Sequence, residues 1–443
     1  MRNIFLLVAL NLTVAATAQK TTPLTATEKS VIIDSVALQL EKYYVFPDKA
    51  KSMTSYLRKR NKEKAYATLT DYKAFVDTLA QDLQRVHKDL HLSLSYNPQQ
   101  VSRVRQWNAA PQPTDAMLEE RKQWARKANF GFVKVERLPG NIGYLDFRNF
   151  FAVNEESENT VAAAMAFLLN TDAVIIDLRK NGGGDPEMVQ LILSYFMDEK
   201  PVHYNSIYNR PTDSTQHFYS LEKVKGQKMP GKDLYILTSR NTFSAAEEFA
   251  YNFKNLKKAL LIGETTGGGA HPTSLYAANN AVVMAIPMAR SISPITQTNW
   301  EGTGVEPDVK VEASKALAHA QKQVLQKAMA KATDPMEKAQ LQWVQAAVDA
   351  ELNPVTVGES TLQQYVGQYG DRTITLEGGQ LYYQRAGRGK MRLLPLSDQL
   401  FQPESLDYFR VQFVKDAKGN VEKIIGLYDS GQTDESPRTA KTF

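Results

Sequence analysis

Between residues 140 and 310, continuously apolar segments alternate with amphipathic segments, and this alternation restricts the fold more than any other feature of the sequence. The apolar segments, which we predict to be strands, are 142–147, 173–176, 234–237, 260–262 and 282–286. Helices are expected between them near 155–170, 185–198 and 244–255. Strands that are apolar on both faces are typical of sheets that carry helices on both sides. The sequence therefore predicts an α/β domain.

The chain before this region is predicted to be mainly helical over residues 25–105. Thr25 and Glu28 form the pattern of a helix capping box, and apolar residues follow at helical spacing. A second helix is expected to begin at Asp71. Apolar and polar residues then alternate from position 90 to position 96, which predicts a half-buried strand with His91 on its polar face.

The chain after residue 312 predicts two further parts. Residues 313–352 are rich in Ala, Lys, Gln and Glu, and we expect a helical hairpin that acts as a spacer. Beyond Asn353, short alternating apolar runs are separated by glycine-containing turns, which is typical of a small antiparallel β domain. The expected domains are an N-terminal helical domain, the α/β domain, the spacer and the β domain, at 19–105, 106–312, 313–353 and 354–443.

The first eighteen residues have the features of a secretory signal peptide. Arg2 gives a positively charged start, an apolar stretch follows as far as Val14, and positions 16–18 form a small-residue cleavage pattern. The apolar stretch is shorter than the roughly 20 residues that a membrane-spanning helix needs. We therefore predict removal of residues 1–18, export to the periplasm or the medium, and no membrane span.

Composition excludes other classes of function. The 443 residues include 53 Lys and Arg against 48 Asp and Glu, which gives a formal net charge of +5. Acidic residues interrupt most basic clusters, so the basic face expected of a nucleic-acid-binding protein is not evident. The chain has no Cys, so its stability would come from core burial rather than from disulfides.

Three polar segments of the α/β region could carry chemistry. Residues 177–184, DLRKNGGG, follow a predicted strand, and their glycines could form either an anion-binding nest of N–H groups or a flexible turn. Ser244 is expected to open a helix, where N–H groups and the helix dipole favour a developing oxyanion. Ser244 and Glu247 also form a capping-box pattern, and most such serines only cap a helix. Residues 300–308 have the composition of a solvated loop.

In this order and spacing, the segments resemble the S41 peptidase family, which comprises tail-specific and tricorn-type serine proteases and relatives such as the interphotoreceptor retinoid-binding protein. The matching segments are GYL at 143–145, DLRKNGGG at 177–184, TFSAAE at 242–247, GETTGG at 263–268, EGTGVEPD at 301–308 and YYVFP at 43–47. The resemblance implies a crotonase/ClpP-like β/α catalytic domain that cleaves peptide bonds. It assigns Ser244 as the nucleophile and Gly183 and Ala245 as the oxyanion hole.

The resemblance also bears on the catalytic base. The tail-specific branch uses a Lys in the glycine-rich turn after the nucleophile helix, and that position is Gly269 here. The tricorn-type branch uses a His and a Glu that correspond to His91 and Glu301. A neutral imidazole is a suitable base near neutral pH, and a carboxylate can fix its tautomer. We therefore expect Ser244, His91 and Glu301 to be catalytic.

Each assignment has an alternative. His91 could be a surface histidine of its strand, and His271, just after the glycines, is a competing base. Glu301 rests on the motif match. The tricorn-type site has a Ser immediately before its His, and here that residue is Leu90. Glu301 would therefore reach His91 directly, through Ser93 or through water.

The expected protein is thus an exported serine endopeptidase that acts on a peptide or protein substrate, without a metal or cofactor. The interval between residues 96 and 143 is too short for the PDZ domain of tail-specific proteases, so we expect a peptide to bind extended along a sheet edge. Two alternatives stay open. One is a binding protein of the same fold for an apolar ligand or a cell-envelope component, and the other is a serine esterase. The sequence does not predict the oligomeric state.

Overall fold

The computed structural model describes residues 23–109 and 114–439, which divide into two units. The N-terminal unit consists of residues 1–113, 209–213 and 272–289, and the C-terminal unit contains the rest of the chain. The predicted signal peptide, residues 1–18, lies outside the described residues. Within the described ranges, no helix has both the length and the apolar character that crossing a membrane requires.

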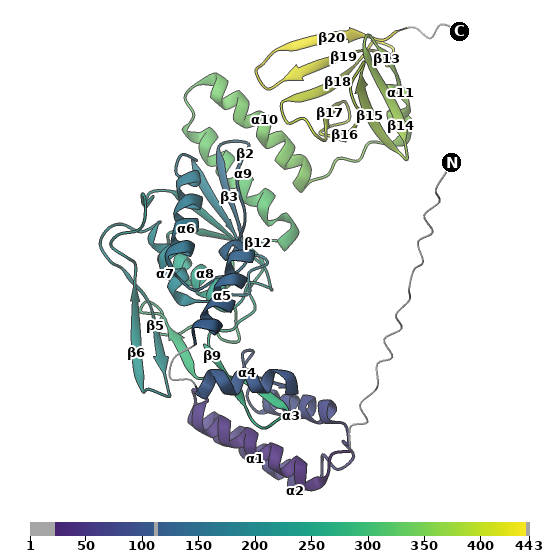
Figure 1. Ribbon diagram of the computed structural model, residues 1–443. Coiled ribbons are helices and arrows are strands. Elements are labelled where there is room, and N and C mark those ends of the chain that lie inside the picture. Colours follow the sequence, from purple (N-terminus) through teal and green to yellow (C-terminus); the bar gives the residue numbers. More distant parts are fainter. Residues whose placement is uncertain (1–22, 110–113, 440–443) are drawn as a thin grey trace, which may run out of the picture. The chain divides into compact units, whose positions relative to one another are not determined.

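The N-terminal unit packs helices against a small antiparallel sheet with the strand order β1-β10-β9 (Figure 1). Its elements are α1 (Ala26–Tyr43), α2 (Pro47–Lys62), α3 (Tyr72–Val86), β1 (Ser93–Tyr96), α4 (Pro98–Ala109), β9 (Thr273–Ala277) and β10 (Val282–Pro287). The predicted capping box is present, because Thr25 and Glu28 exchange hydrogen bonds at the start of α1. Asp71 caps α3, as expected.

The strand predicted at 282–286 exists, but it lies in this small sheet and not in the α/β sheet. Val282, Met284 and Ile286 pack into the core that contains α1, α2 and α3, whereas Val283 contacts α4. Helices therefore cover both faces of β10, just as they do in an α/β sheet. An apolar composition shows that a strand is buried but does not show which sheet contains it.

His91 does not lie on a strand, contrary to the prediction. β1 begins at Ser93, and His91 lies in the preceding turn, which Leu92 N–H closes by donating to the Asp89 carbonyl at 3.1 Å. The buried Asp89 carboxylate accepts hydrogen bonds from His91 N–H at 3.0 Å and from the Tyr44 hydroxyl at 2.8 Å. This local side-chain acceptor stabilises a turn where the alternation alone indicated a strand.

A six-stranded sheet with the order β12-β8-β7-β4-β3-β2 forms the centre of the C-terminal unit and confirms the predicted α/β class. β2 is antiparallel to β3, and the other neighbours are parallel. The strands are β2 (Phe132–Leu138), β3 (Ile142–Phe147), β4 (Ala173–Asp177), β7 (Asp233–Thr238), β8 (Leu260–Gly263) and β12 (Val309–Lys310). The accompanying helices are α5 (Asp115–Lys127), η1 (Asn129–Gly131), α6 (Glu155–Leu168), α7 (Pro186–Ser194), α8 (Ala245–Asn255) and η2 (Ala313–Lys315).

Helices cover both faces of this sheet, which explains its continuously apolar strands. Val174 and Ile176 of β4 pack into a core with α6, α7 and α8. Ala173 and Ile175 point the other way and pack with α9 (Ala316–Lys331) and α10 (Pro335–Leu352). Burial of each larger apolar side chain contributes roughly 1.5–3 kcal/mol. The helical hairpin that we predicted as a spacer is therefore also one layer of the α/β core.

A hairpin that the sequence did not predict extends from the region between α7 and β7. It consists of β5 (His203–Asn209) and β6 (Ser214–Tyr219), and β5 also pairs with β11 (Ala289–Ile292).

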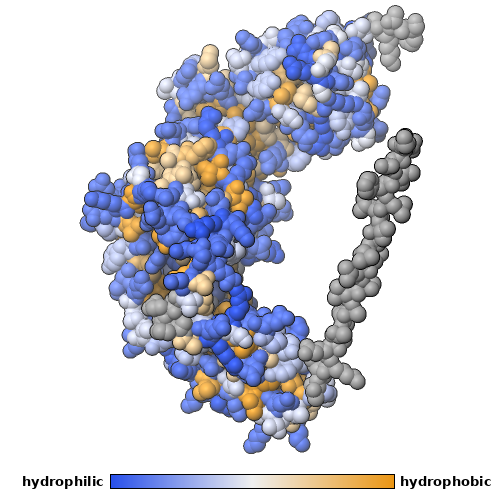
Figure 2. Space-filling model, viewed as in Figure 1, coloured by the Kyte–Doolittle hydropathy of each residue, from blue (hydrophilic) through white to orange (hydrophobic). Residues whose placement is uncertain are grey.

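On the face shown in Figure 2, hydrophilic residues predominate and the apolar residues are scattered among them.

The predicted C-terminal β domain is confirmed as an eight-stranded antiparallel sheet in sequential order, which follows α11 (Glu359–Tyr365). Its strands are β13 (Gly367–Tyr369), β14 (Arg372–Glu377), β15 (Gln380–Arg385), β16 (Met391–Pro395), β17 (Leu400–Pro403), β18 (Phe409–Lys415), β19 (Val421–Tyr428) and β20 (Thr433–Pro437). Arg438 pairs with Tyr369, and Thr439 N–H donates to the Gln368 carbonyl at 2.8 Å. The last strand thus returns to the first, and the sheet closes into a barrel (Figure 1).

Candidate active site

Ser244 adopts a backbone conformation that non-glycine residues rarely adopt. It is the N-cap of α8, with φ 57° and ψ −123°. A side chain held at positive φ costs on the order of 1–3 kcal/mol, so the surrounding structure must enforce it. Such a strained turn between a strand and a helix is the geometry that presents the nucleophilic serine in α/β-hydrolases.

The glycine-rich turn after β4 lies directly against Ser244. Phe243 N–H donates to the Asn181 carbonyl at 3.1 Å, which joins the two turns. Gly183 has φ 101°, and a Cβ atom there would lie 2.7 Å from Ser244 Cβ and 2.8 Å from the Ala245 nitrogen. Only a glycine permits this close approach, and the structure thus brings Gly183, Ser244 and Ala245 together.

Gly183 N–H already has an acceptor in this structure. It donates to Asn181 Oδ1 at 2.8 Å, while Asn181 Nδ2 donates to the Phe147 carbonyl at 3.0 Å. An oxyanion at this position would have to share or displace the Asn181 contact. Ala245 N–H lies in the first turn of α8, where N–H groups have no partner within the helix. Of the two predicted oxyanion donors, Ala245 therefore requires less rearrangement.

Glu247 connects the Ser244 turn to the glycine-rich turn after β8. Its buried carboxylate accepts hydrogen bonds from Ser244 N–H at 2.9 Å, the Thr266 hydroxyl at 2.5 Å, Gly268 N–H at 2.6 Å and Gly269 N–H at 2.8 Å. Burial raises the pKa of Glu247, and these hydrogen bonds oppose the shift. The sequence indicated Glu247 only as a capping residue, and its contacts with Thr266, Gly268 and Gly269 were not predicted.

The DLR part of the 177–184 motif has a structural role. Asp177, at the end of β4, accepts hydrogen bonds from Arg179 Nε at 2.9 Å and from the Tyr144 hydroxyl at 2.7 Å. Burial acts to raise the pKa of Asp177, but hydrogen bonds and the positive charge of Arg179 outweigh it and lower the pKa. Arg179 also donates to the Ala313 carbonyl at 2.5 Å. These contacts fix the strand end from which the glycine-rich turn begins.

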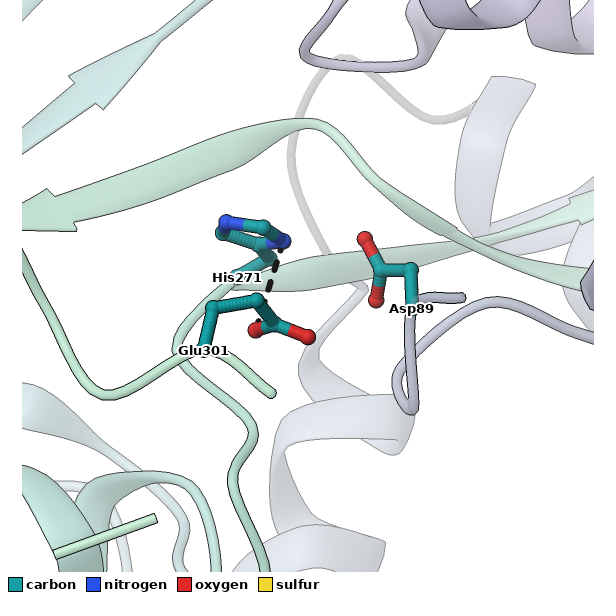
Figure 3. Close-up of side chains that lie close together, drawn as sticks. All are labelled: Asp89, His271 and Glu301. Carbon is teal, nitrogen blue, oxygen red and sulfur yellow. Dashed lines mark ion pairs between the residues drawn. The ribbon is translucent and has the colours of Figure 1, made fainter. Parts of the chain in front are cut away.

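His271 and Glu301 form an ion-pair contact (Figure 3). His271 Nδ1 lies 3.3 Å from Glu301 Oε2, and the same oxygen accepts a hydrogen bond from Ala270 N–H at 2.6 Å. The His271 side chain is 4% exposed and that of Glu301 15%. Trp300 Nε1 donates to the Gly269 carbonyl at 2.7 Å, which holds the two loops together. The predicted orienting carboxylate thus faces the competing base.

The predicted site residues are distributed over both units. Gly183, Ser244, Ala245, His271 and Glu301 belong to the C-terminal unit, whereas His91 belongs to the N-terminal unit. The pairing of His91 with Ser244 and with Glu301 stays a prediction. Among the described residues, neither unit by itself gathers three His, Cys, Asp or Glu ligand atoms at one point.

Two family descriptions match this chain. Residues 141–311 match "Peptidase family S41", and residues 16–132 match "N-terminal domain of Peptidase_S41 in eukaryotic IRBP". Over residues 141–311, the chain belongs to peptidase family S41. We refer to this region as the S41 domain. It contains the turns around Gly183 and Ser244 as well as His271 and Glu301, whereas His91 lies in the region that matches the N-terminal domain description.

Curated relatives match the chain over part of their length. Carboxyl-terminal-processing peptidase 2 of Arabidopsis thaliana chloroplasts is 29% identical over 188 residues, which cover 39% of this chain and 33% of the relative. The carboxyl-terminal-processing protease of Picosynechococcus is 25% identical over 173 residues, which cover 39% of this chain and 40% of the relative. The matches thus span two fifths or less of these proteins.

Solved structures of peptidases resemble the chain at low sequence identity. A peptidase structure from Parabacteroides merdae has a TM-score of 0.45 and 18% identity, covering 64% of this chain and 90% of that one. The tricorn protease has a TM-score of 0.38 and 15% identity, covering 66% of this chain and 35% of the protease.

Another carboxyl group of the S41 domain was not found by sequence reasoning. Glu248 follows Glu247 on α8, is 4% exposed, and accepts a hydrogen bond from Asn205 Nδ2 at 2.9 Å. Burial raises the pKa of Glu248 to about 8. A carboxyl group in this environment is mostly protonated at neutral pH, so Glu248 adds little negative charge to α8.

Replacement of Gly183 by Ala should distort the Ser244 turn. The added methyl group would contact Ser244 and Ala245 at less than 3 Å, and Ala disfavours φ 101°. We expect destabilisation of about 1–3 kcal/mol in chemical denaturation. Gly182→Ala is the matched control, because its added methyl group would have no atom within 4 Å and its φ is not in the left-handed region. Equal stabilities of the two variants would contradict this account of the turn.

Replacement of Glu248 by Gln should change how stability depends on pH. Because the pKa of Glu248 is raised from 4.5 to about 8 on folding, the native protein should lose stability relative to the variant as the pH rises through this range. The difference grows by at most about 1.4 kcal/mol per pH unit. Denaturation curves at pH 5 and pH 8 measure it, with the exposed Glu199→Gln as control. A difference independent of pH would exclude the assigned burial effect.

Proposed function

We propose that this protein is an exported serine endopeptidase whose nucleophile is Ser244. The observation that carries the proposal is the positive-φ conformation of Ser244 at the N-terminus of α8, with Gly183 in contact and the Ala245 N–H beside it. Capping a helix does not require a serine in this conformation, because N-cap residues usually have extended backbone angles. Membership of the S41 family over this domain supports the same role.

In the proposed reaction, Ser244 Oγ attacks the carbonyl carbon of the scissile peptide bond. The negative charge that develops on the carbonyl oxygen is stabilised by Ala245 N–H, by Gly183 N–H after release of Asn181, and by the dipole of α8. Collapse of the tetrahedral intermediate expels the amine, which takes the proton that the base accepted from Ser244. A water molecule then hydrolyses the acyl-enzyme by the same steps in reverse.

We propose His91 as the base, with Glu301 as the carboxylate that orients it. The turn that carries His91 is fixed by the buried Asp89 carboxylate, which supports a defined position for the imidazole. His271 is the second candidate, because Glu301 already contacts its Nδ1 atom in the S41 domain. In either case a carboxylate bonded to Nδ1 would leave Nε2 to accept the proton of Ser244.

The substrate is proposed to be a peptide or protein segment in extended conformation. Strand addition to a sheet edge offers main-chain hydrogen bonds without a separate recognition domain. In the C-terminal unit, β2 and β12 are the edge strands of the central sheet. The signal-peptide pattern of residues 1–18 supports export, so the substrate would be met in the periplasm or the medium.

Ser244→Ala should abolish turnover of a fluorescent casein substrate and labelling by a fluorophosphonate probe. We expect a loss of about 10³–10⁶-fold in kcat, because members of a catalytic unit act together. Ser102→Ala, at an exposed serine outside the site, serves as control. Retention of most of the activity in Ser244→Ala would place the nucleophile elsewhere. If the probe does not label the parent protein and a ligand raises the melting temperature of the protein, the binding-protein alternative would be favoured.

The activity should rise between pH 5 and pH 8 as the catalytic imidazole loses its proton, because only the neutral imidazole can accept the proton of Ser244. A constant rate from pH 5 to pH 8 would argue against a histidine base. His91→Gln and His271→Gln distinguish the two candidates, since only loss of the true base removes both the rate and this pH dependence. Loss of rate with an unchanged pH midpoint identifies the other histidine as a structural residue.

A further inference from the structure

Arg410 of β18 is a buried arginine that has no carboxylate partner. Arg410 is 4% exposed, and in the described part of the chain no carboxylate lies within ion-pair distance of its guanidinium. Nε donates to Gln402 Oε1 at 3.1 Å, and Nη2 donates to the Trp343 carbonyl. The guanidinium carbon lies 3.7 Å from the centre of the Trp343 ring. Burial without a compensating anion lowers the pKa of Arg410 to about 10.

Arg410 lines a pocket of about 630 Å³ between the barrel, α10 and the turn that joins β2 to β3. A pocket of this size accommodates a ligand of several residues or a small molecule. Trp343 forms part of its wall and is itself fixed by a hydrogen bond of 2.7 Å from Nε1 to the Asp407 carbonyl. The guanidinium is therefore held in one orientation by stacking and by two hydrogen bonds, neither of which uses Nη1.

The rim of this pocket is mainly acidic, although one exposed cation, Arg137, also lines it. Exposed carboxylates line it, and in the described part of the chain none of them forms an ion pair: Asp172, Glu337, Glu351, Asp407 and Asp429. In the described part of the chain, none of these carboxylates forms an ion pair with Arg410, whose hydrogen-bond acceptors are Gln402 and the Trp343 carbonyl. The pocket thus combines a buried cation with an acidic rim, and a ligand complementary to both has an anionic end followed by cationic groups.

We propose that this pocket binds the carboxylate of a basic peptide, with the carboxylate on Arg410 and the basic side chains at the acidic rim. An arginine with a fixed guanidinium is the residue best suited to bind a carboxylate through charged hydrogen bonds. Binding would also remove the cost of a buried charge without a counter-ion. The carboxylate comes either from the free C-terminus of the peptide or from an acidic side chain. This proposal goes beyond the proposed peptidase activity and does not require Ser244 to be catalytic.

Isothermal titration calorimetry on the full chain carrying Ser244→Ala tests this site without cleavage of the peptide. The probe is the N-acetylated peptide Lys-Lys-Ala-Ala with a free C-terminus, and its C-terminal amide is the comparison. We expect saturable binding of the free acid. The amide should bind more weakly by a factor of about 10 or more, because it is neutral and cannot form an ion pair with the guanidinium. An amidated peptide that ends in Glu distinguishes the two sources of carboxylate, since its binding would show that a side chain suffices.

Arg410→Gln should weaken binding of the free acid about 10-fold or more, since the variant removes the charge. Arg388→Gln is the matched control, because Arg388 is an exposed arginine of the same barrel outside the pocket. If Arg410→Gln does not fold, the comparison of acid and amide in the parent chain still decides. Equal binding of acid and amide, no saturable binding up to millimolar peptide, or unchanged binding in folded Arg410→Gln would each overturn the proposal.

Discussion

The buried carboxylate of Glu247 is the interaction on which the arrangement around Ser244 depends. It accepts hydrogen bonds from Ser244 N–H, Thr266 and the N–H groups of Gly268 and Gly269. Burying a carboxylate is unfavourable unless such donors surround it. The four donors come from two loops, so satisfying the carboxylate also fixes these loops to each other. The strained backbone of Ser244 persists because its N–H is one of these donors.

Much of the fold could be predicted from periodicity. Continuously apolar segments predict the strands of the central sheet, and the amphipathic segments between them predict helices α6, α7 and α8. This alternation arises because helices cover both faces of the sheet. The sequence was a poorer guide to which strands pair with each other. β10 has the same apolar composition as the central strands but pairs with β1. The role of α9 and α10 as a layer of the core was also missed, since their many polar residues concealed the side that faces the sheet.

The site was predictable where a residue type is required by its position. Gly183 must be glycine because its Cα lies against Ser244, and the motif already contained that information. The partners of Glu301 were harder to predict from the sequence, because a carboxylate on a loop can face any neighbour that the fold provides. In the S41 domain that neighbour is His271. The turn around His91 was missed because one acceptor, the Asp89 carboxylate, overrides the strand pattern.

The closure of the C-terminal barrel has a consequence for how this part of the protein comes apart. In an open sheet, an outermost strand can detach while the remaining strands stay paired. Here the contacts of Arg438 with Tyr369 and of Thr439 with Gln368 join the two ends of the strand series. Detaching any strand would expose two rows of unpaired backbone groups at once. We therefore expect the ring to melt cooperatively, as one body, without fraying from its terminus.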